Sequence, residues 1–197
     1  MRLSIIREEI LNNVPKYRAD PNDLYINIRS GDIFINAIHG DYSQPPLCFY
    51  QKIINENNYN NIYILSNGHE NPVVDALLKL YSKIIYIHGT VEDDISVLIN
   101  AYNLVMPVST FPITLIVLNN NLRKLYFYEI IYYSLQKGNY IIHKMEPSIK
   151  YKTIMQRKWK NSNEQLDLMI NETCINSSLI SYSAKDNVYI FRDEIFY

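Results

Sequence analysis

The sequence predicts an α/β domain in which a parallel β-sheet is covered by helices on both faces. Three observations predict this fold class. Short runs of β-forming residues recur along the chain, turn residues follow each run, and stretches of about ten residues with apolar positions at helical spacing separate one run from the next. Strands that alternate with helices in this way pair in parallel through right-handed crossovers. The length of 197 residues is enough for one such domain with a sizeable core.

The first elements follow from apolar spacing and from proline. A helix is expected over residues 2–13, because its isoleucines and leucines recur at helical spacing and Pro15 ends the pattern. Residues 24–28 (LYINI) are expected to form the first strand, and residues 29–32 a turn at its carboxyl end. The prolines at 45 and 46 suit the start of the next helix, which has an inward apolar stripe.

The same strand, turn and helix then follow a second time. Residues 62–65 (IYIL) predict a strand, and residues 66–68 predict a turn after it. Asn71 suits the N-cap of the next helix. On the outer face of that helix, Asp75 and Lys79 have the spacing of an ion pair.

The third and fourth strands complete the central part of the predicted sheet. Residues 84–87 (IIYI) are expected to form the third strand, and the helix after it is expected to begin at Asp93 or Asp94. Residues 104–108 (LVMPV) are expected to form the fourth strand. Ser109 then suits the N-cap of another helix.

The pattern weakens toward the carboxyl end of the chain. A fifth strand is expected at residues 124–128 (KLYFY), a short strand at 140–143, and a capped helix that begins at Asn161 or Ser162 and runs to residue 170. We therefore expect residues 1–170 to form the domain and residues 171–197 an appendage of uncertain order.

Composition and charge exclude several classes of protein. Hydrophobic residues make up 48% and charged residues 20%, as in an ordinary folded domain. Nineteen basic against twenty acidic side chains give a net charge of −1, which is too little positive charge to hold a nucleic acid. The longest apolar stretch, residues 104–118, is interrupted and shorter than a membrane span of roughly 20 residues, so no membrane span is expected. The first residues do not fit a signal peptide, which leaves the compartment open, with the cytoplasm as default.

Cysteine, histidine and asparagine patterns give no further site. Cys48 and Cys174 lie far apart and in no C-x-x-C spacing, which argues against a zinc site and against a disulfide scaffold. The four histidines sit in separate turns, so no metal site is expected. Asn171-Glu-Thr and Asn176-Ser-Ser fit the N-glycosylation sequon, but such triplets are also expected by chance in an asparagine-rich chain.

Candidate binding residues lie at the ends of the predicted strands. In an open parallel sheet, ligands bind beyond the carboxyl ends of the strands. Residues 109–111 lead into a helix there, and backbone N–H groups at a helix start favour an anion. Arg29 ends the first strand and could bind the same anion through two N–H groups. The plainer alternatives are that Ser109 is only an N-cap and that Arg29 only forms a surface salt bridge.

Four sequence blocks carry a resemblance to a known family. The superfamily is that of the fucosyltransferases that use GDP-fucose, which includes α-1,2-, α-1,6- and protein O-fucosyltransferases. The blocks that resemble it are IRSGDIF at 28–34, YSQPPLCFY at 42–50, DISVLINA at 94–101 and STF at 109–111. Residues 159–169 are similar to the closing region of such domains. The resemblance covers roughly residues 20–170.

The resemblance implies a Rossmann-like nucleotide-sugar domain, the C-terminal half of a two-domain GT-B glycosyltransferase. Such an enzyme transfers fucose from GDP-fucose to a hydroxyl of a glycan or of a protein-linked sugar, with inversion and without a metal or other cofactor. By the same resemblance, Arg29 holds the β-phosphate and stabilises the leaving group. Asp94 accepts hydrogen bonds from guanine, Ser109 and Thr110 bind the phosphates, and Asp32 orients Arg29. Phe111 completes the STF block of this substrate site.

The chain also departs from the family pattern. Asn27 stands where the family usually has a histidine before the motif arginine. Candidates for the general base that deprotonates the acceptor are His39 and Asp41. The chain is too short to hold the acceptor half, so the alternatives are an incomplete enzyme, a chain that works with a partner supplying that domain, or a non-catalytic remnant that only binds GDP-sugar. A plain α/β interaction domain is the third reading.

Overall fold

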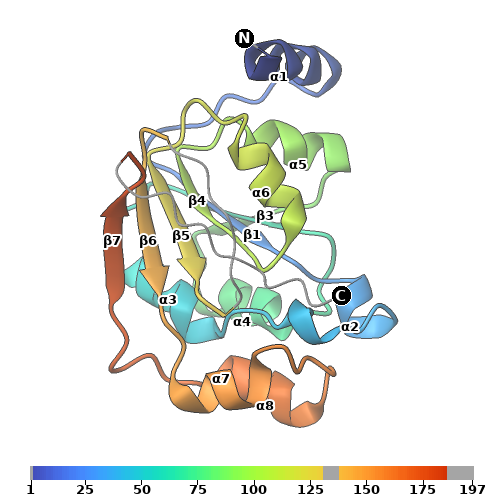
Figure 1. Cartoon of the computed structure of the whole chain (residues 1–197), viewed down its shortest axis with the longest axis vertical. Helices are drawn as coiled ribbons and strands as arrows, with labels where there is room; N and C mark the ends of the chain where they lie inside the picture. Colours follow the sequence, from blue (N-terminus) through green and yellow to red (C-terminus); the bar gives the residue numbers. More distant parts are fainter. Residues whose placement is uncertain (1, 131–137, 186–197) are drawn as a thin grey trace.

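The seven strands form one sheet, in the order β3-β2-β1-β4-β5-β6-β7, in a computed structural model that describes residues 2–130 and 138–185 (Figure 1). All neighbouring strands are parallel except β6 and β7, which are antiparallel. This confirms the predicted α/β fold with a Rossmann-like, mostly parallel sheet flanked by helices. The strands are β1 (Leu24–Ile28), β2 (Ile62–Ser66), β3 (Ile84–Ile87), β4 (Asn103–Val105), β5 (Lys124–Tyr128), β6 (Ile141–Met145) and β7 (Leu179–Ser183).

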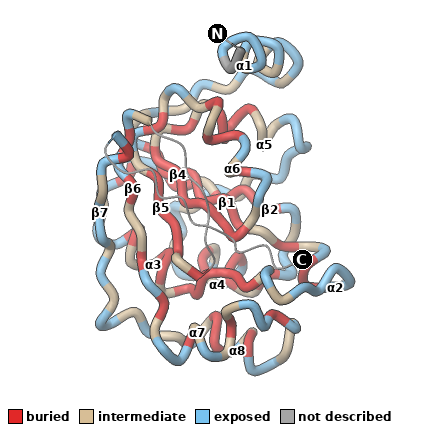
Figure 2. The backbone as a smooth tube through the Cα atoms, viewed as in Figure 1, coloured by how far each residue is buried: buried red, intermediate tan, exposed pale blue. Residues whose placement is uncertain are grey.

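Helices cover both faces of this sheet, and each face has its own core. They are α1 (Arg2–Asn13), α2 (Asp32–Ile35), η1 (Gly40–Tyr42), α3 (Leu47–Asn55), α4 (Pro72–Leu80), α5 (Val91–Leu98), α6 (Thr110–Ile116), α7 (Ile149–Met155) and α8 (Asn163–Asn171). One core joins α3, α4, α7 and α8 to the sheet, and the other joins α1, α5 and α6 to its opposite face. The central strands β1, β2, β4 and β5 are buried along most of their length (Figure 2), whereas the edge strands β3 and β7 contain no buried residue.

The central strand β1 positions the site. Every residue of β1 is buried, and the strand pairs with β2 on one side and β4 on the other. The chain first extends the sheet outward through β2 and β3 and then returns to add β4 on the opposite side of β1. Loops leaving β1 and β4 therefore diverge, which opens a crevice at their carboxyl ends.

Most predicted elements are confirmed, and two boundaries are corrected. The helix after β3 begins at Val91 rather than at Asp93 or Asp94, because Thr90 is its N-cap. Asp93 instead closes a capping box with Thr90, since each side chain bonds the other's backbone N–H. The fourth strand ends at Val105, before the proline that the predicted range included, and proline lacks the N–H that a ladder needs.

The predicted ion pair on α4 is wrong. In the described part of the chain, Asp75 pairs with His69, in the loop before the helix, and not with Lys79. Asp75 is in the first turn of α4, so its carboxylate lies next to the loop that carries His69.

The sheet and core continue past residue 170. Strand β7 pairs with β6 from Leu179 to Ser183, and α7 (Ile149–Met155) lies in a stretch for which the sequence predicts no element. Cys48 and Cys174 form a disulfide, which corrects the expectation drawn from their separation. They are 126 residues apart in sequence, but packing of α3 against α8 brings their Cα atoms within 5.6 Å.

None of the helices in the described ranges combines the length and the apolar character needed to cross a bilayer.

Candidate functional site

A pocket of about 260 Å³ opens at the carboxyl ends of β1, β2 and β4, in the crevice between the diverging loops. It is formed by β1 and its following loop, by the loop after β2, and by the starts of α5 and α6. Six of the nine residues that the sequence singled out line it. The complete lining is Asn27, Ile28, Arg29, Asp32, Asn67, Val91, Asp94, Ser109 and Phe111.

Arg29 is held on three sides at this pocket. Its Nη1 donates to the Ser109 hydroxyl at 3.3 Å, and its Nη2 lies 3.3 Å from an oxygen of Asp32. The guanidinium carbon lies 5.0 Å from the centre of the Tyr42 ring, at the distance of a cation–π contact. These contacts hold the plane of the guanidinium through the protein's own side chains.

One donor of Arg29 has no partner. Its Nε is buried and makes no hydrogen bond to the described residues. A buried N–H without an acceptor costs free energy, and an anionic oxygen in the pocket would remove that cost through a short charge-assisted bond. The arrangement therefore suits an anion such as a phosphate.

The loop after β2 holds the loop that carries Arg29. Asn71 donates from Nδ2 to the Arg29 carbonyl at 3.0 Å, and its backbone N–H donates to the Ser30 hydroxyl at 2.8 Å. Glu70 accepts from the Ser30 hydroxyl at 2.9 Å and from the Gly31 N–H at 3.0 Å. Asn67 accepts from the Ser30 N–H at 3.0 Å. The backbone from Arg29 to Gly31 is thus bonded to one neighbouring loop throughout.

The carboxylate of Glu70 in this loop contact is favoured in its ionised form. Hydrogen bonds from its own backbone N–H, from the Ser30 hydroxyl and from the Gly31 N–H hold the pKa of Glu70 below its ordinary value. The sequence predicted a turn after the second strand and an N-cap at Asn71, but it predicted no role for Asn67 or Glu70 and no bond from the Asn71 amide to Arg29. The signal available was a run of polar residues at a strand end.

Gly31 is required by this loop. Its φ of +65° lies in the left-handed region, and an added Cβ would lie 2.6 Å from Nδ2 of Asn67. We expect Gly31→Ala to lower the free energy of unfolding by about 1–2 kcal/mol and to displace the loop of Arg29. Urea unfolding measures the first effect, and an unchanged midpoint would contradict it.

Asp94 is the acidic group of the pocket. The capping box starts α5 at Val91 and so places Asp94 in the first turn of the helix, facing the cavity. Partial burial, followed by the neighbouring charge of Asp93, raises the pKa of Asp94 to about 6, against a smaller lowering effect of His88. Its carboxylate accepts no side-chain hydrogen bond from the described residues. It is a partly desolvated acceptor that can take hydrogen bonds from a ligand.

Asn27 and Ser109 complete the polar wall. Asn27 is buried in the pocket lining, where its Nδ2 donates to the Leu65 carbonyl at 3.4 Å. Ser109 caps α6, since its hydroxyl accepts from the Phe111 N–H at 3.4 Å as well as from Arg29. The N-cap role of Ser109 is confirmed, and the same hydroxyl is also a partner of Arg29; its binding of a phosphate stays a prediction.

Three predicted residues lie outside the pocket lining. Thr110 is exposed at the first position of α6. His39 and Asp41 are exposed on the η1 loop, where the ring nitrogen of His39 accepts from the Asp41 N–H at 3.3 Å. Tyr42 connects this loop to Arg29, since its ring centre lies 5.6 Å from that of His39 and 5.0 Å from the guanidinium carbon.

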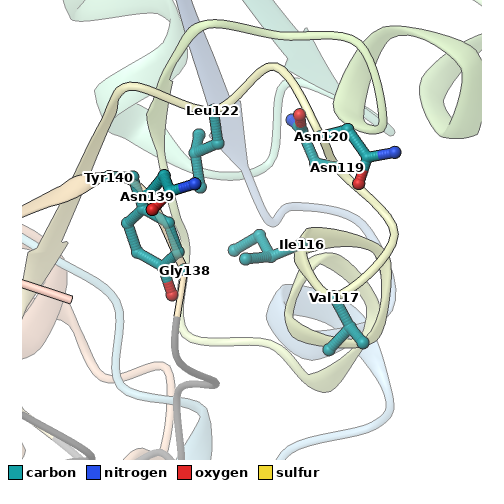
Figure 3. A pocket seen from close by; sticks show the side chains of 8 residues that line it. All are labelled: Ile116, Val117, Asn119, Asn120, Leu122, Gly138, Asn139 and Tyr140. Atoms are coloured by element: carbon teal, nitrogen blue, oxygen red, sulfur yellow. The ribbon is translucent and has the colours of Figure 1, made fainter. Parts of the chain in front are cut away.

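Two other cavities lack this combination of groups. Figure 3 shows one of about 260 Å³ between the end of α6 and the residues just before β6, and its lining contains no charged side chain. A second, of about 310 Å³, lies where the chain enters β1 and includes Arg18 and Asp20. No cluster of three or more potential metal ligands occurs in residues 2–130 and 138–185.

Comparison with known proteins adds no assignment, since no family model, no curated protein and no solved structure matches the chain.

Proposed function

We propose that this chain binds GDP-fucose and is the donor half of a fucosyltransferase. The observation that carries the proposal is the pairing of Arg29, with its unpartnered buried Nε, and Asp94, with its free acceptor oxygens, in one pocket at the β1/β4 crevice. A ligand that satisfies both groups has an anionic part for the guanidinium and N–H donors for the carboxylate. The sequence resemblance to fucosyltransferases supports the same ligand.

The choice of base follows from the carboxylate of Asp94. An ionised carboxylate only accepts hydrogen bonds. Guanine presents two adjacent N–H donors, on N1 and on the exocyclic amine, whereas uracil and adenine each present one donor beside an acceptor. A carboxylate therefore favours guanine over the other two. In this proposal Asp94 reads the base and Arg29 binds the diphosphate.

The proposed reaction uses the same groups. The acceptor hydroxyl oxygen attacks the anomeric carbon of fucose from the face opposite GDP, the bond from that carbon to the β-phosphate oxygen breaks, and the hydroxyl proton passes to a base. Arg29 stabilises the charge that grows on the departing phosphate. His39 or Asp41 would take the proton, from the loop that also carries Tyr42.

One observation favours a second candidate function. His39 and Asp41 are exposed, interact with each other, and lie outside the pocket lining. A chain that binds GDP-sugar without transferring it needs Arg29 and Asp94 but no base. An enzyme would need a partner chain that supplies the acceptor half, whereas this remnant would need none.

Nucleotide-dependent thermal stability tests the proposal. A nucleotide at about 100 times its dissociation constant adds about 2.7 kcal/mol, which corresponds to a rise of roughly 5–10 °C in the unfolding midpoint. We expect this rise with GDP and GDP-fucose and not with UDP or ADP. Equal or absent shifts with all four nucleotides would overturn the proposal. Transfer of radiolabelled fucose to glycan acceptors then separates the enzyme from the remnant.

The affinity for GDP is expected to fall below about pH 6. The pKa of Asp94 is about 6, and the protonated carboxyl loses one of its acceptor oxygens and its charge. Titration calorimetry at pH 7.5 and pH 5 measures the change, and the salt concentration is kept constant. An affinity for GDP that is the same at both values would contradict the role of Asp94.

Asp94→Asn is expected to have opposite effects on binding and stability. A carboxyl whose pKa is raised on folding destabilises the folded protein at pH values above its folded pKa, and the penalty disappears as the pH falls toward 3.8. The variant should therefore be more stable than the wild type at pH 7.5, by about 1–2 kcal/mol because water screens the half-buried group, and equal to it near pH 4. It should also lose the GDP shift.

Glu92→Gln is the matched control for this variant. Glu92 lies on the same first turn of α5 but is exposed and does not line the pocket. Its substitution removes one negative charge from the helix start without touching the cavity. If Glu92→Gln also gained stability and lost GDP binding, both effects of Asp94→Asn would be due to the negative charge at the start of α5 and not to the pocket.

A further inference from the structure

The loop between α8 and β7 carries two features that the donor site does not use. It contains Cys174, and it holds the only two Asn-x-Ser/Thr sequons of the chain, at Asn171 and at Asn176. The two acceptor asparagines lie three residues before and two residues after the cysteine. From the sequence alone, such triplets are expected by chance in an asparagine-rich chain. The structure shows how exposed they are and which residues lie beside them.

Both acceptor asparagines are accessible. Asn171 is the last residue of α8 and is exposed, and its side-chain amide reaches only Asp167 on the helix surface, at 2.7 Å. Asn176 is exposed in a turn that the bond from the Ser177 N–H to the Cys174 carbonyl closes at 3.1 Å. The hydroxyl residues of the two sequons, Thr173 and Ser178, are exposed as well.

The disulfide is the independent observation. Cys48 and Cys174 are bonded, and disulfides persist in oxidising compartments such as the endoplasmic reticulum and outside the cell. Attachment of glycans to Asn-x-Ser/Thr belongs to the same secretory route. The cysteine pairing depends on distance in the fold, whereas the sequons depend on local sequence, so neither observation implies the other.

The loop does not belong to the lining of the candidate pocket. The pocket lies at the carboxyl ends of β1, β2 and β4. The loop leads into β7, which is an edge strand, whereas β1 and β4 are central strands (Figure 1). Three strand spacings separate β4 from β7, which amounts to about 14 Å before the length of the loop is added.

We propose that the loop is N-glycosylated at Asn171 and Asn176 and that the chain folds in an oxidising secretory compartment. In the step itself, the side-chain nitrogen of asparagine attacks the anomeric carbon of the first sugar of a lipid-linked diphospho-oligosaccharide. A nitrogen–carbon bond forms, the bond from that carbon to the phosphate oxygen breaks, and the amide loses one proton as the lipid diphosphate leaves.

Deglycosylation of the full chain tests the proposal. The protein isolated from its source cells should migrate faster after treatment with peptide N-glycosidase, which converts each occupied asparagine to aspartate. Peptide mass spectrometry then places the conversion at residues 171 and 176. Asn171→Gln and Asn176→Gln should each remove one mobility step, and Thr173→Ala and Ser178→Ala should do the same with both asparagines retained.

Asn163→Gln is the matched control. Asn163 is exposed on the same helix, α8, but is not part of a sequon, so its substitution should leave both mobility steps in place. Protein from source cells with unmodified asparagines at both positions would overturn the proposal. Rapid alkylation that finds Cys48 and Cys174 as free thiols there would overturn the oxidising compartment. Neither result depends on nucleotide binding.

Discussion

Arg29→Ala is expected to lower the affinity for GDP by about a hundredfold or more and to remove the GDP-induced rise in the unfolding midpoint. Truncation of one partner of a buried, hydrogen-bonded charge pair typically costs about 2–5 kcal/mol in binding. Arg29 combines a buried Nε with a guanidinium held by Asp32 and Tyr42. Titration calorimetry with GDP measures the loss. If the chain transfers fucose, turnover should fall by at least a similar factor.

Two variants sharpen this test. Arg29→Lys keeps the charge but not the planar fork, so its affinity for GDP should lie between those of the wild type and the alanine variant. Arg123→Ala is the matched control, because Arg123 also lies over a tyrosine ring, that of Tyr102 at 4.7 Å, but outside the pocket lining. GDP affinity reduced equally by Arg29→Ala and Arg123→Ala would contradict a phosphate site at Arg29.

Removal of the disulfide is expected to have the largest effect on stability. The double variant Cys48→Ser, Cys174→Ser should lose about 2–5 kcal/mol of unfolding free energy, or roughly 5–15 °C in the midpoint, since the bond closes a long loop of the unfolded chain. The bond connects residues separated by 126 positions. Thermal unfolding of the wild type and the double variant under oxidising conditions measures the difference.

Reductant provides the internal control for this prediction. It should lower the midpoint of the wild type to that of the double variant and leave the variant unchanged. A wild-type midpoint insensitive to reductant, together with free thiols detected in the folded protein, would mean that Cys48 and Cys174 are not bonded in solution.

The elements that could be predicted are those whose signals are local. Caps are one example: Asn71 and Ser109 are predicted from the side chain at the helix start, and each accepts the expected backbone N–H. Of the two alternatives Asn161 and Ser162 for the last helix, Ser162 is the N-cap. The start of α5 was missed although Thr90 and Asp93 form a capping box, because the apolar spacing of that helix becomes clear only after its first turn.

Strand β7 and the disulfide could not be predicted, because both depend on a partner distant in the chain. The sequence LISYS is half polar, with no buried residue, and is stable as a strand only along the edge of β6. Cys48 and Cys174 meet only when α8 packs against α3. Pairwise contacts of this kind leave no periodicity in either segment.

For the candidate site too, residues at strand and helix ends could be predicted, and contacts between separate loops could not. Arg29, Asp94 and Ser109 end strands or start helices of one parallel sheet, so topology alone predicts that they converge. The supports of Arg29 could not be predicted: Tyr42 beneath the guanidinium and Glu70 at the Gly31 N–H are side-chain contacts between separate loops. Their spacing along the chain carries no information about them.

The hydrogen bonds between the loop after β1 and the loop after β2 have a consequence for the thermodynamics of ligand binding. Backbone groups of three consecutive residues from Arg29 to Gly31 are bonded to the protein's own side chains, those of Asn71, Asn67 and Glu70. A ligand that arrives does not have to order this backbone, and ordering costs about 1–2 kcal/mol per residue. Most of the interaction energy of an anion with Arg29 is then retained as affinity, so binding should proceed with little loss of conformational entropy in the protein.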